Sequence, residues 1–284
     1  MIRHILAAES WPAGRFNEDR IAVAGPYLWV LDGATGLRPG RSFPGDSDAA
    51  WFAEAWSSAL MELAPRSASP QSLIVAAHEH VSKRIDASLR GPLAQDEYPA
   101  LALAFVRVAD GRLDACNIGD CSIIVRDRTS VRRLGSSEVD RFDALALDVF
   151  TSAVAEGQTH AGALRLARSQ ILRNRQRANC RDGYWVVDPS ARWLDHVQNF
   201  SMAFDTGGDL LVASDGFMRI LDPYGISTTL ENVLDSTRDM GAAAILDRIR
   251  ALEADDPDCR AFPRLKPVDD ASVVMAAFAS AEDR

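Results

Sequence analysis

The stretch Tyr27-Leu28-Trp29-Val30-Leu31-Asp32-Gly33 decides how this sequence folds, because its apolar run stops abruptly at an aspartate and a glycine. The length of the run and its aromatic and β-branched content predict a buried strand. A carboxylate at the end of such a strand projects from a rigid scaffold at the rim of a sheet. The glycine beside it lets the backbone approach a ligand closely.

The same pattern recurs at the boundaries of other apolar runs. Asp120 follows Asn117-Ile118-Gly119, Asp215 follows Leu210–Ser214 and precedes Gly216, and Asp269 and Asp270 directly precede Ala271–Met275. If the fold gathers these side chains, their like charges are unfavourable unless protons or cations compensate them. Clusters that offer only oxygen ligands suit hard cations such as Mg²⁺ or Mn²⁺.

The remaining sequence alternates between blocks of strands and blocks of helices. We expect strands at 27–31, 100–108, 113–118, 122–125, 199–204, 209–213 and 272–278. We expect helices from the cap candidates at 46–48 to Leu63, across 73–85, 142–177 and 216–222, and over roughly 227–254. Hairpin-like strands outnumber strand-helix-strand units, which favours a β-sandwich flanked by helices over a doubly wound parallel sheet. The predicted fold class is α+β, a four-layer α-β-β-α sandwich of two antiparallel sheets.

Helical periodicity predicts which faces of these helices are buried. The first helix should bury Trp51, Phe52, Ala55, Trp56, Ala59, Leu60 and Leu63. The second should bury Leu73, Ala77, Val81 and Ile85. In the 142–177 region, one shared face comprises Phe142, Leu145, Val149 and Ala153.

Composition narrows the class of protein. The 284 residues are 47% hydrophobic and 25% charged, with a net charge of -9, so a nucleic-acid partner is not expected. No apolar run approaches about 18 residues, and the N-terminus lacks a signal-peptide core, so we expect a cytoplasmic protein without a membrane partner. The four cysteines match no zinc template. No linker divides the chain, and we predict a single domain over 1–284.

Five motifs in order resemble those of the PPM (type 2C) protein phosphatases, and they run from near the N-terminus to the last predicted strand. They are Asn17-Glu18-Asp19, Trp29–Gly36, Asn117–Asp120, Leu211–Phe217 and Asp269–Val274. The resemblance implies a β-sandwich with a two-metal centre at one end, holding Mg²⁺ or Mn²⁺ with a weaker third ion. The metal-binding residues that it implies are Asp19, Asp32, Gly33, Asp120, Asp215 and Asp269. Asp32 resembles the bridging carboxylate, Gly33 the main-chain ligand and Asp120 the ligand of the third ion. Asp270 is expected to support the ligands rather than to bind metal.

The chemistry of such a centre suggests a mechanism. Two metals about 3.5 to 4 Å apart can share one water and lower its pKa toward neutrality. The resulting hydroxide would attack phosphorus in line, without a phosphoenzyme. The catalytic residues are then Asp19, Asp32 and an arginine that binds the phosphate oxygens. Arg15 is the candidate arginine, and Arg20 competes with it for this role.

The sequence departs from the family pattern in three places. Position 34 is alanine where some members carry histidine, so protonation of the leaving group falls to water. The family's Gly-Asp-Ser-Arg pattern appears as Gly119-Asp120-Cys121-Ser122, without the arginine. Its threonine-aspartate-histidine-serine stretch is missing, and a divergent helical flap-like segment at about 136–182 follows instead. The arginines of 165–181 form either a solvated helix face or a contact for a phosphorylated partner.

Three functions remain open at this point. The resemblance implies a protein phosphatase that acts on phosphoserine or phosphothreonine in a phosphorylated protein substrate. A catalytically weak phosphoprotein-binding module of the same fold is a second possibility, and a small-molecule phosphomonoesterase is a third. The residues do not indicate an oligomeric state.

Overall fold

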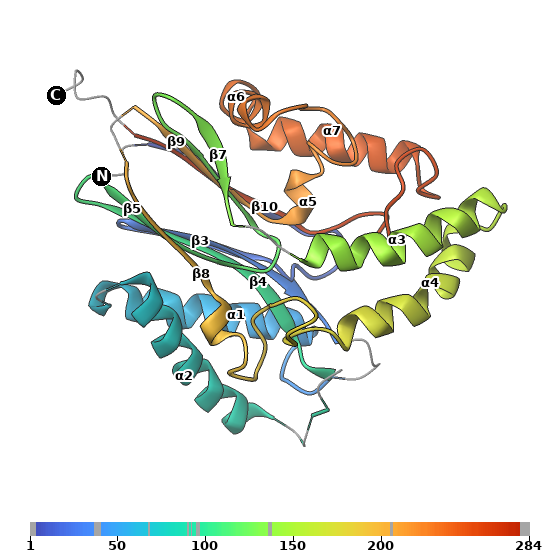
Figure 1. Cartoon of the computed structure of the whole chain (residues 1–284), viewed down its shortest axis with the longest axis horizontal. Coiled ribbons are helices and arrows are strands. Elements are labelled where there is room, and N and C mark those ends of the chain that lie inside the picture. Colours follow the sequence, from blue (N-terminus) through green and yellow to red (C-terminus); the bar gives the residue numbers. More distant parts are fainter. Residues whose placement is uncertain are drawn as a thin grey trace.

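A computed structural model of the chain describes residues 4–36, 41–67, 69–89, 91, 93–94, 97–135, 138–204 and 207–278. The strands of this part of the chain form two antiparallel sheets that pack face to face (Figure 1). One sheet has the order β1 (His4–Trp11), β10 (Ala271–Ala277), β9 (Asp209–Ala213), β6 (Ser122–Arg126) and β7 (Val131–Leu134). The other has the order β2 (Arg20–Ala24), β3 (Tyr27–Ala34), β4 (Ala100–Ala109), β5 (Arg112–Ile118) and β8 (Gln198–Ala203).

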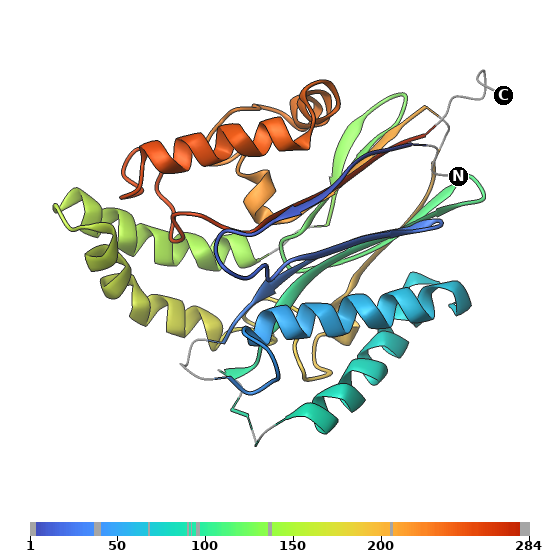
Figure 2. The ribbon, with the colours of Figure 1, turned by 180° about the vertical axis from the view of Figure 1, so that it is seen from behind.

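Helices cover both outer faces of the sandwich, as the two opposite views show (Figures 1 and 2). The sheet that contains β3 is covered by α1 (Asp48–Leu63) and α2 (Pro70–Ser88). The other sheet is covered by α6 (Leu230–Met240) and α7 (Ala242–Asp255), beside the short α5 (Asp215–Met218). A helical pair, α3 (Val139–Ala155) and α4 (His160–Arg175), lies at one end of the sandwich (Figure 1). The predicted α+β, four-layer α-β-β-α sandwich is confirmed.

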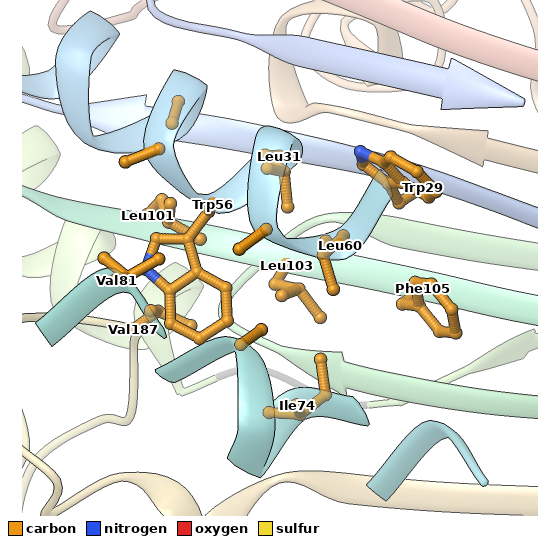
Figure 3. Packing of buried hydrophobic residues seen from close by; sticks show 14 of the residues in the cluster. Trp29, Leu31, Trp56, Leu60, Ile74, Val81, Leu101, Leu103, Phe105 and Val187 are labelled. Carbon is orange, nitrogen blue, oxygen red and sulfur yellow. The ribbon is translucent and has the colours of Figure 1, made fainter. Parts of the chain in front are cut away.

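Strand β3 is buried on both faces, which explains its continuous apolar run. Trp29 and Leu31 belong to the core under α1 and α2, whereas Leu28 and Val30 belong to the core between the sheets. Side chains of successive strand residues point to opposite faces, so one short run supplies both cores. Figure 3 shows Trp56 of α1 near β4 and α2 in the outer core.

The predicted buried faces of the first two helices are confirmed. In α1 all seven residues that we expected inside are buried or half-buried, and in α2 all four expected residues are buried. Helix α1 begins after Ser47, one of the predicted cap candidates, whose hydroxyl accepts a hydrogen bond from Ala50 N. This cap satisfies one of the free backbone donors at the helix start.

Two predicted helical regions are each divided by a glycine with positive φ. The 142–177 region is two helices separated at Gly157 (φ 89°), and the 227–254 region divides at Gly241 (φ 82°). Glycine adopts this conformation at no steric cost, so the chain can reverse there. Helix α5 also ends at Met218, earlier than predicted. Ser136 and Ser137, at the start of the predicted flap-like segment, lie outside the described residues.

The predicted buried face of α3 was partly wrong. Leu145 and Val149 are 45% and 37% exposed. The buried positions are Phe142, Ala146, Phe150 and Ala153. The difference arises because Phe150 and Ala153 pack with the small residues Ala163 and Ala167 of α4, which rotates the buried stripe by one position from the most apolar one.

Strands β1, β2 and β7 were not predicted. They lie at the edges of the two sheets, where one side of each strand lacks a pairing neighbour. Edge strands need no continuous apolar run, so the sequence gives a weak signal for them. In the described part of the chain, no helix has the length and apolar character required to cross a membrane.

Candidate active site

Strand pairing brings the predicted carboxylates to one end of the sandwich. In one sheet Ala34, which ends β3, pairs with Ala100, which begins β4. In the other sheet Ala213, which ends β9, pairs with both Ser122 at the start of β6 and Val273 near the start of β10. The aspartates next to these positions therefore share one end of the fold, although up to 250 residues separate them (Asp19 to Asp269).

Asp19 is buried at this end of the sandwich. It precedes β2, whose first residue Arg20 pairs with Leu31. Asp19 is 1% exposed, and neither of its carboxylate oxygens has a hydrogen-bond partner among the described residues. The hydroxyls of Ser272 and Ser214 lie nearby without forming a hydrogen bond of good geometry with it. Burial raises the pKa of Asp19 to about 7; these hydroxyls oppose the effect, and the charges of Asp215 and Asp270 reinforce it.

Asp32 and Asp120 belong to the same electrostatic cluster. Burial raises the pKa of Asp32 well above its usual range, and the charges of Asp19, Asp215 and Asp120 add to this effect. Burial likewise raises the pKa of Asp120 to about 8, with further contributions from Asp215 and from Asp143 of α3. Carboxylates that raise one another's pKa in this way are held close together by the fold, at a cost that a bound cation would relieve.

Asp269 differs from the others because cations of the protein already contact it. The Nζ of Lys266 lies 2.8 Å from Oδ1 of Asp269, and Nη2 of Arg219 lies 3.3 Å from Oδ2. Burial and the charge of Asp215 nevertheless raise the pKa of Asp269 to about 6, and Lys266 and Arg219 only partly oppose them. Asp269 therefore belongs to the cluster, but both of its carboxylate oxygens already accept hydrogen bonds from cationic side chains.

The two glycines of the Asp-Gly motifs are required by close backbone packing. A Cβ added to Gly33 would lie 2.5 Å from the carbonyl oxygen of Glu18, and one added to Gly216 would lie 1.9 Å from that of Asp270. Both distances are shorter than atoms can approach without a shift of the backbone. The glycines therefore let the strand ends that carry Asp32 and Asp215 lie directly against the other segments of the site.

Asp270 holds the first motif against the last strand. Its Oδ1 accepts a hydrogen bond from Ala13 N and its Oδ2 accepts one from Glu18 N, both at 2.6 Å. The carboxylate of Glu18 in turn accepts hydrogen bonds from the hydroxyls of Thr35 and Ser47. Asp270 therefore fixes the segment that carries Asp19; its expected supporting role at a metal centre stays a prediction.

Comparison with known proteins identifies the family of the chain. Residues 11–249 match the family described as protein phosphatase 2C. The chain belongs to the protein phosphatase 2C family. No protein with a curated function matches the sequence.

Solved structures of bacterial serine/threonine phosphatases share the fold of this family member. The enzyme PstP/Ppp of Mycobacterium tuberculosis superposes with a TM-score of 0.55 at 16% identity, covering 96% of this chain and 97% of that one. The phosphatase of S. agalactiae gives 0.56 at 13% identity, covering 97% and 99%. Stp1 from Staphylococcus aureus gives 0.53 at 13% identity, covering 99% and 96%. The PstP catalytic domain has also been solved in complex with two manganese ions.

The two candidate phosphate-binding arginines have different surroundings. The guanidinium of Arg20 donates to Glu54 at 2.7 Å and to the carbonyl oxygens of Asn17 and Asp19 at 2.8 and 2.7 Å. Arg15 is exposed and forms no hydrogen bond or ion pair among the described residues; it packs on the ring of Phe16. Arg15 also borders a surface hollow of about 430 Å³ beside the first motif. Arg20 lines the same hollow, but its Nε and Nη1 donors are engaged, whereas no donor of Arg15 is engaged among the described residues.

The donor set fits a hard divalent cation in its chemistry. The cluster is rich in carboxylate oxygens, and Asp19 contributes two buried oxygens without partners among the described residues. In the part of the chain that the structure describes, no three acidic, histidine or cysteine side chains surround a single point closely enough to hold an ion. Asp269 is held by Lys266 and Arg219 in this arrangement.

Two residues of the site were missed by sequence reasoning. Lys266 contacts Asp269, and the charge of Asp143 in α3 acts on Asp120. Arg175 of α4, one of the arginines of 165–181, donates to the carbonyl oxygens of Ala34 and Thr35 at 3.3 and 3.1 Å. No motif marks Asp143, which comes from the divergent helical pair. Most other arginines of 165–181 are exposed, as a solvated face predicts. The position of Lys266, three residues before Asp269, was the one available signal.

Proposed function

We propose that the chain is a metal-dependent phosphatase that hydrolyses phosphoserine and phosphothreonine in proteins. The family and the fold are those of protein phosphatases. The observation that carries the proposal is the carboxylate of Asp19, which is buried without a partner among aspartates that raise its pKa. A buried carboxylate of this kind must bind a proton or a cation. Groups with strongly shifted pKa values gather at functional sites, which favours a catalytic cation here.

In this proposal the side chains of Asp19, Asp32, Asp215 and Asp269 and the main-chain oxygen of Gly33 would hold two Mg²⁺ or Mn²⁺ ions, and Asp120 would hold a weaker third. Divalent cations bound there would lower the pKa of a water molecule and so supply a nucleophile at neutral pH. Asp270 keeps Asp19 in place through the Ala13 and Glu18 amides. Arg15 orients the phosphate, and the chain offers no acid at Ala34, so the leaving group takes its proton from water. The single domain over 1–284 and the cytoplasmic location remain predictions.

Hydrolysis should depend strictly on divalent metal. We expect the purified chain to hydrolyse p-nitrophenyl phosphate and phosphoserine or phosphothreonine peptides with Mn²⁺, and to lose this activity in excess chelator. Steady-state rates with peptides and with small sugar phosphates measure the preference. Activity that survives the chelator would contradict the metal mechanism. Phosphopeptide binding without turnover at saturating Mn²⁺ would indicate a binding module, and a preference for sugar phosphates would indicate a small-molecule phosphatase.

Arg15 should contribute more to phosphate binding than Arg20. Loss of a charged hydrogen bond to the substrate costs about 1.5–3 kcal/mol, so Arg15→Ala should lower kcat/KM by roughly 10- to 100-fold with little change in melting temperature. Arg20→Ala is the matched comparison: it should lower the melting temperature, because it breaks the contact with Glu54, and it should affect kcat/KM less. A larger catalytic loss in Arg20→Ala at unchanged stability would reverse the assignment.

A further inference from the structure

A cationic side chain of the protein, that of Lys266, contacts the carboxylate cluster at Asp269. Lys266 is one of only two lysines in the sequence, and the other, Lys83, is exposed on α2. The Lys266 ammonium lies 2.8 Å from Oδ1 of Asp269, and its interaction extends to the charges of Asp215 and Asp32. The side chain of Lys266 is 59% exposed, so it reaches the cluster from the solvent side.

Both oxygens of Asp269 are committed to donors of the protein. Oδ1 accepts from Lys266 Nζ and, at 3.1 Å, from the backbone N–H of Asp270, and Oδ2 accepts from Arg219 at 3.3 Å. The two cations are anchored differently. Arg219 is buried and also paired with Glu253 at 2.6 Å, whereas Lys266 has no second ion-pair partner among the described residues. Lys266 is therefore the cation that can leave.

We propose that Lys266 is a tethered cation that competes with divalent metal for Asp269. In the metal-free protein its ammonium offsets the repulsion among Asp269, Asp215 and Asp32. A metal ion that binds Asp269 must displace the ammonium into solvent, where its exposed side chain has room to move. Lys266 thus lowers the affinity of the site for metal and stabilises the metal-free fold. This inference rests on the metal centre of the proposed function.

Metal affinity tests the competition directly. We expect Lys266→Met to lower the dissociation constant for Mn²⁺ by about two- to fivefold in calorimetric titration of the full chain, the range that an exposed ion pair allows. Lys266→Arg retains a cation and should remain within about twofold of the wild type, and so should Lys83→Met. Equal or weaker Mn²⁺ binding by Lys266→Met would overturn the proposal.

Thermal unfolding separates competition from a structural role. Lys266→Met should melt lower than the wild type in chelator, and the increase in melting temperature on adding Mn²⁺ should be larger in the variant. An equal loss of stability with and without Mn²⁺ would mean that Lys266 is only a structural contact. If the wild type itself does not bind Mn²⁺, the proposed metal centre fails. If the wild type binds Mn²⁺ and Lys266→Met binds no tighter, only the competition fails.

Discussion

Asp32→Asn should lower kcat/KM for p-nitrophenyl phosphate with Mn²⁺ by at least about a thousandfold, because several kcal/mol of charge stabilisation depend on a metal held in place. In the same variant the melting temperature without metal should rise. The side chains have nearly the same shape, but the amide removes one charge from a cluster in which burial, Asp19, Asp215 and Asp120 all raise the pKa of Asp32. Loss of function and gain of stability should therefore appear together.

The gain in stability should grow with pH. A carboxyl with a raised pKa in the folded state retains its proton where the unfolded chain, with its pKa of 3.8, has lost it. The folded state then binds more protons, so stability falls as pH rises from about 4 through the raised pKa. Asparagine does not titrate, and the advantage of Asp32→Asn in chelator should be larger at pH 8 than at pH 5.5.

A surface aspartate provides the control for this experiment. Asp247 is exposed on α7 and has no ion pair or hydrogen bond through its side chain among the described residues. Asp247→Asn should leave both activity and melting temperature nearly unchanged at either pH. If Asp32→Asn keeps full activity, Asp32 does not hold a catalytic metal. If Asp32→Asn melts lower than the wild type in chelator at pH 8, the charge of Asp32 does not destabilise the metal-free fold.

The second large effect is expected at Gly216. A Cβ at this position would lie 1.9 Å from the carbonyl oxygen of Asp270, so Gly216→Ala must force apart the turn after β9 and the start of β10. These segments are also joined by hydrogen bonds between Ser214 N and Ser272 O at 3.0 Å and between Ser272 N and Ser214 Oγ at 2.9 Å. We expect Gly216→Ala to lower the free energy of unfolding by about 2–4 kcal/mol, as overpacking of rigid backbone does.

Gly216→Ala should also weaken metal binding, because the turn carries Asp215 on one side and the opposing segment carries Asp269. Chemical denaturation measures the stability, and Mn²⁺ titration measures the affinity. Gly91→Ala is the matched control, since nothing lies within 4 Å of the added carbon, and its effect should stay within about 0.5 kcal/mol. A Gly216→Ala variant as stable as the wild type would show that the turn has room for a side chain.

Much of the fold was predictable because local patterns carry it. The apolar run of β3 and the buried stripes of α1 and α2 follow from periodicities of two and 3.6 residues, and each periodicity agrees with the packing found. The edge strands β1, β2 and β7 and the buried face of α3 were missed. For the three strands, the position at a sheet edge decides which residues are buried. For α3, packing against the small residues of α4 decides it. Hydrophobicity along the chain does not predict either.

The sequence by itself determined which aspartates and glycines stand at strand boundaries, and hence the family. Only the tertiary structure decided what surrounds them: an unpartnered buried carboxylate at Asp19, a guanidinium that is engaged by Glu54 and backbone carbonyls at Arg20 but not at Arg15, and the ammonium of Lys266 on Asp269. The physical reason is that strand ends are fixed by local apolar patterns, whereas the partners of a charged side chain depend on segments that may be 250 residues apart in the chain (Asp19 to Asp269). Their proximity arises only when the two sheets pack together.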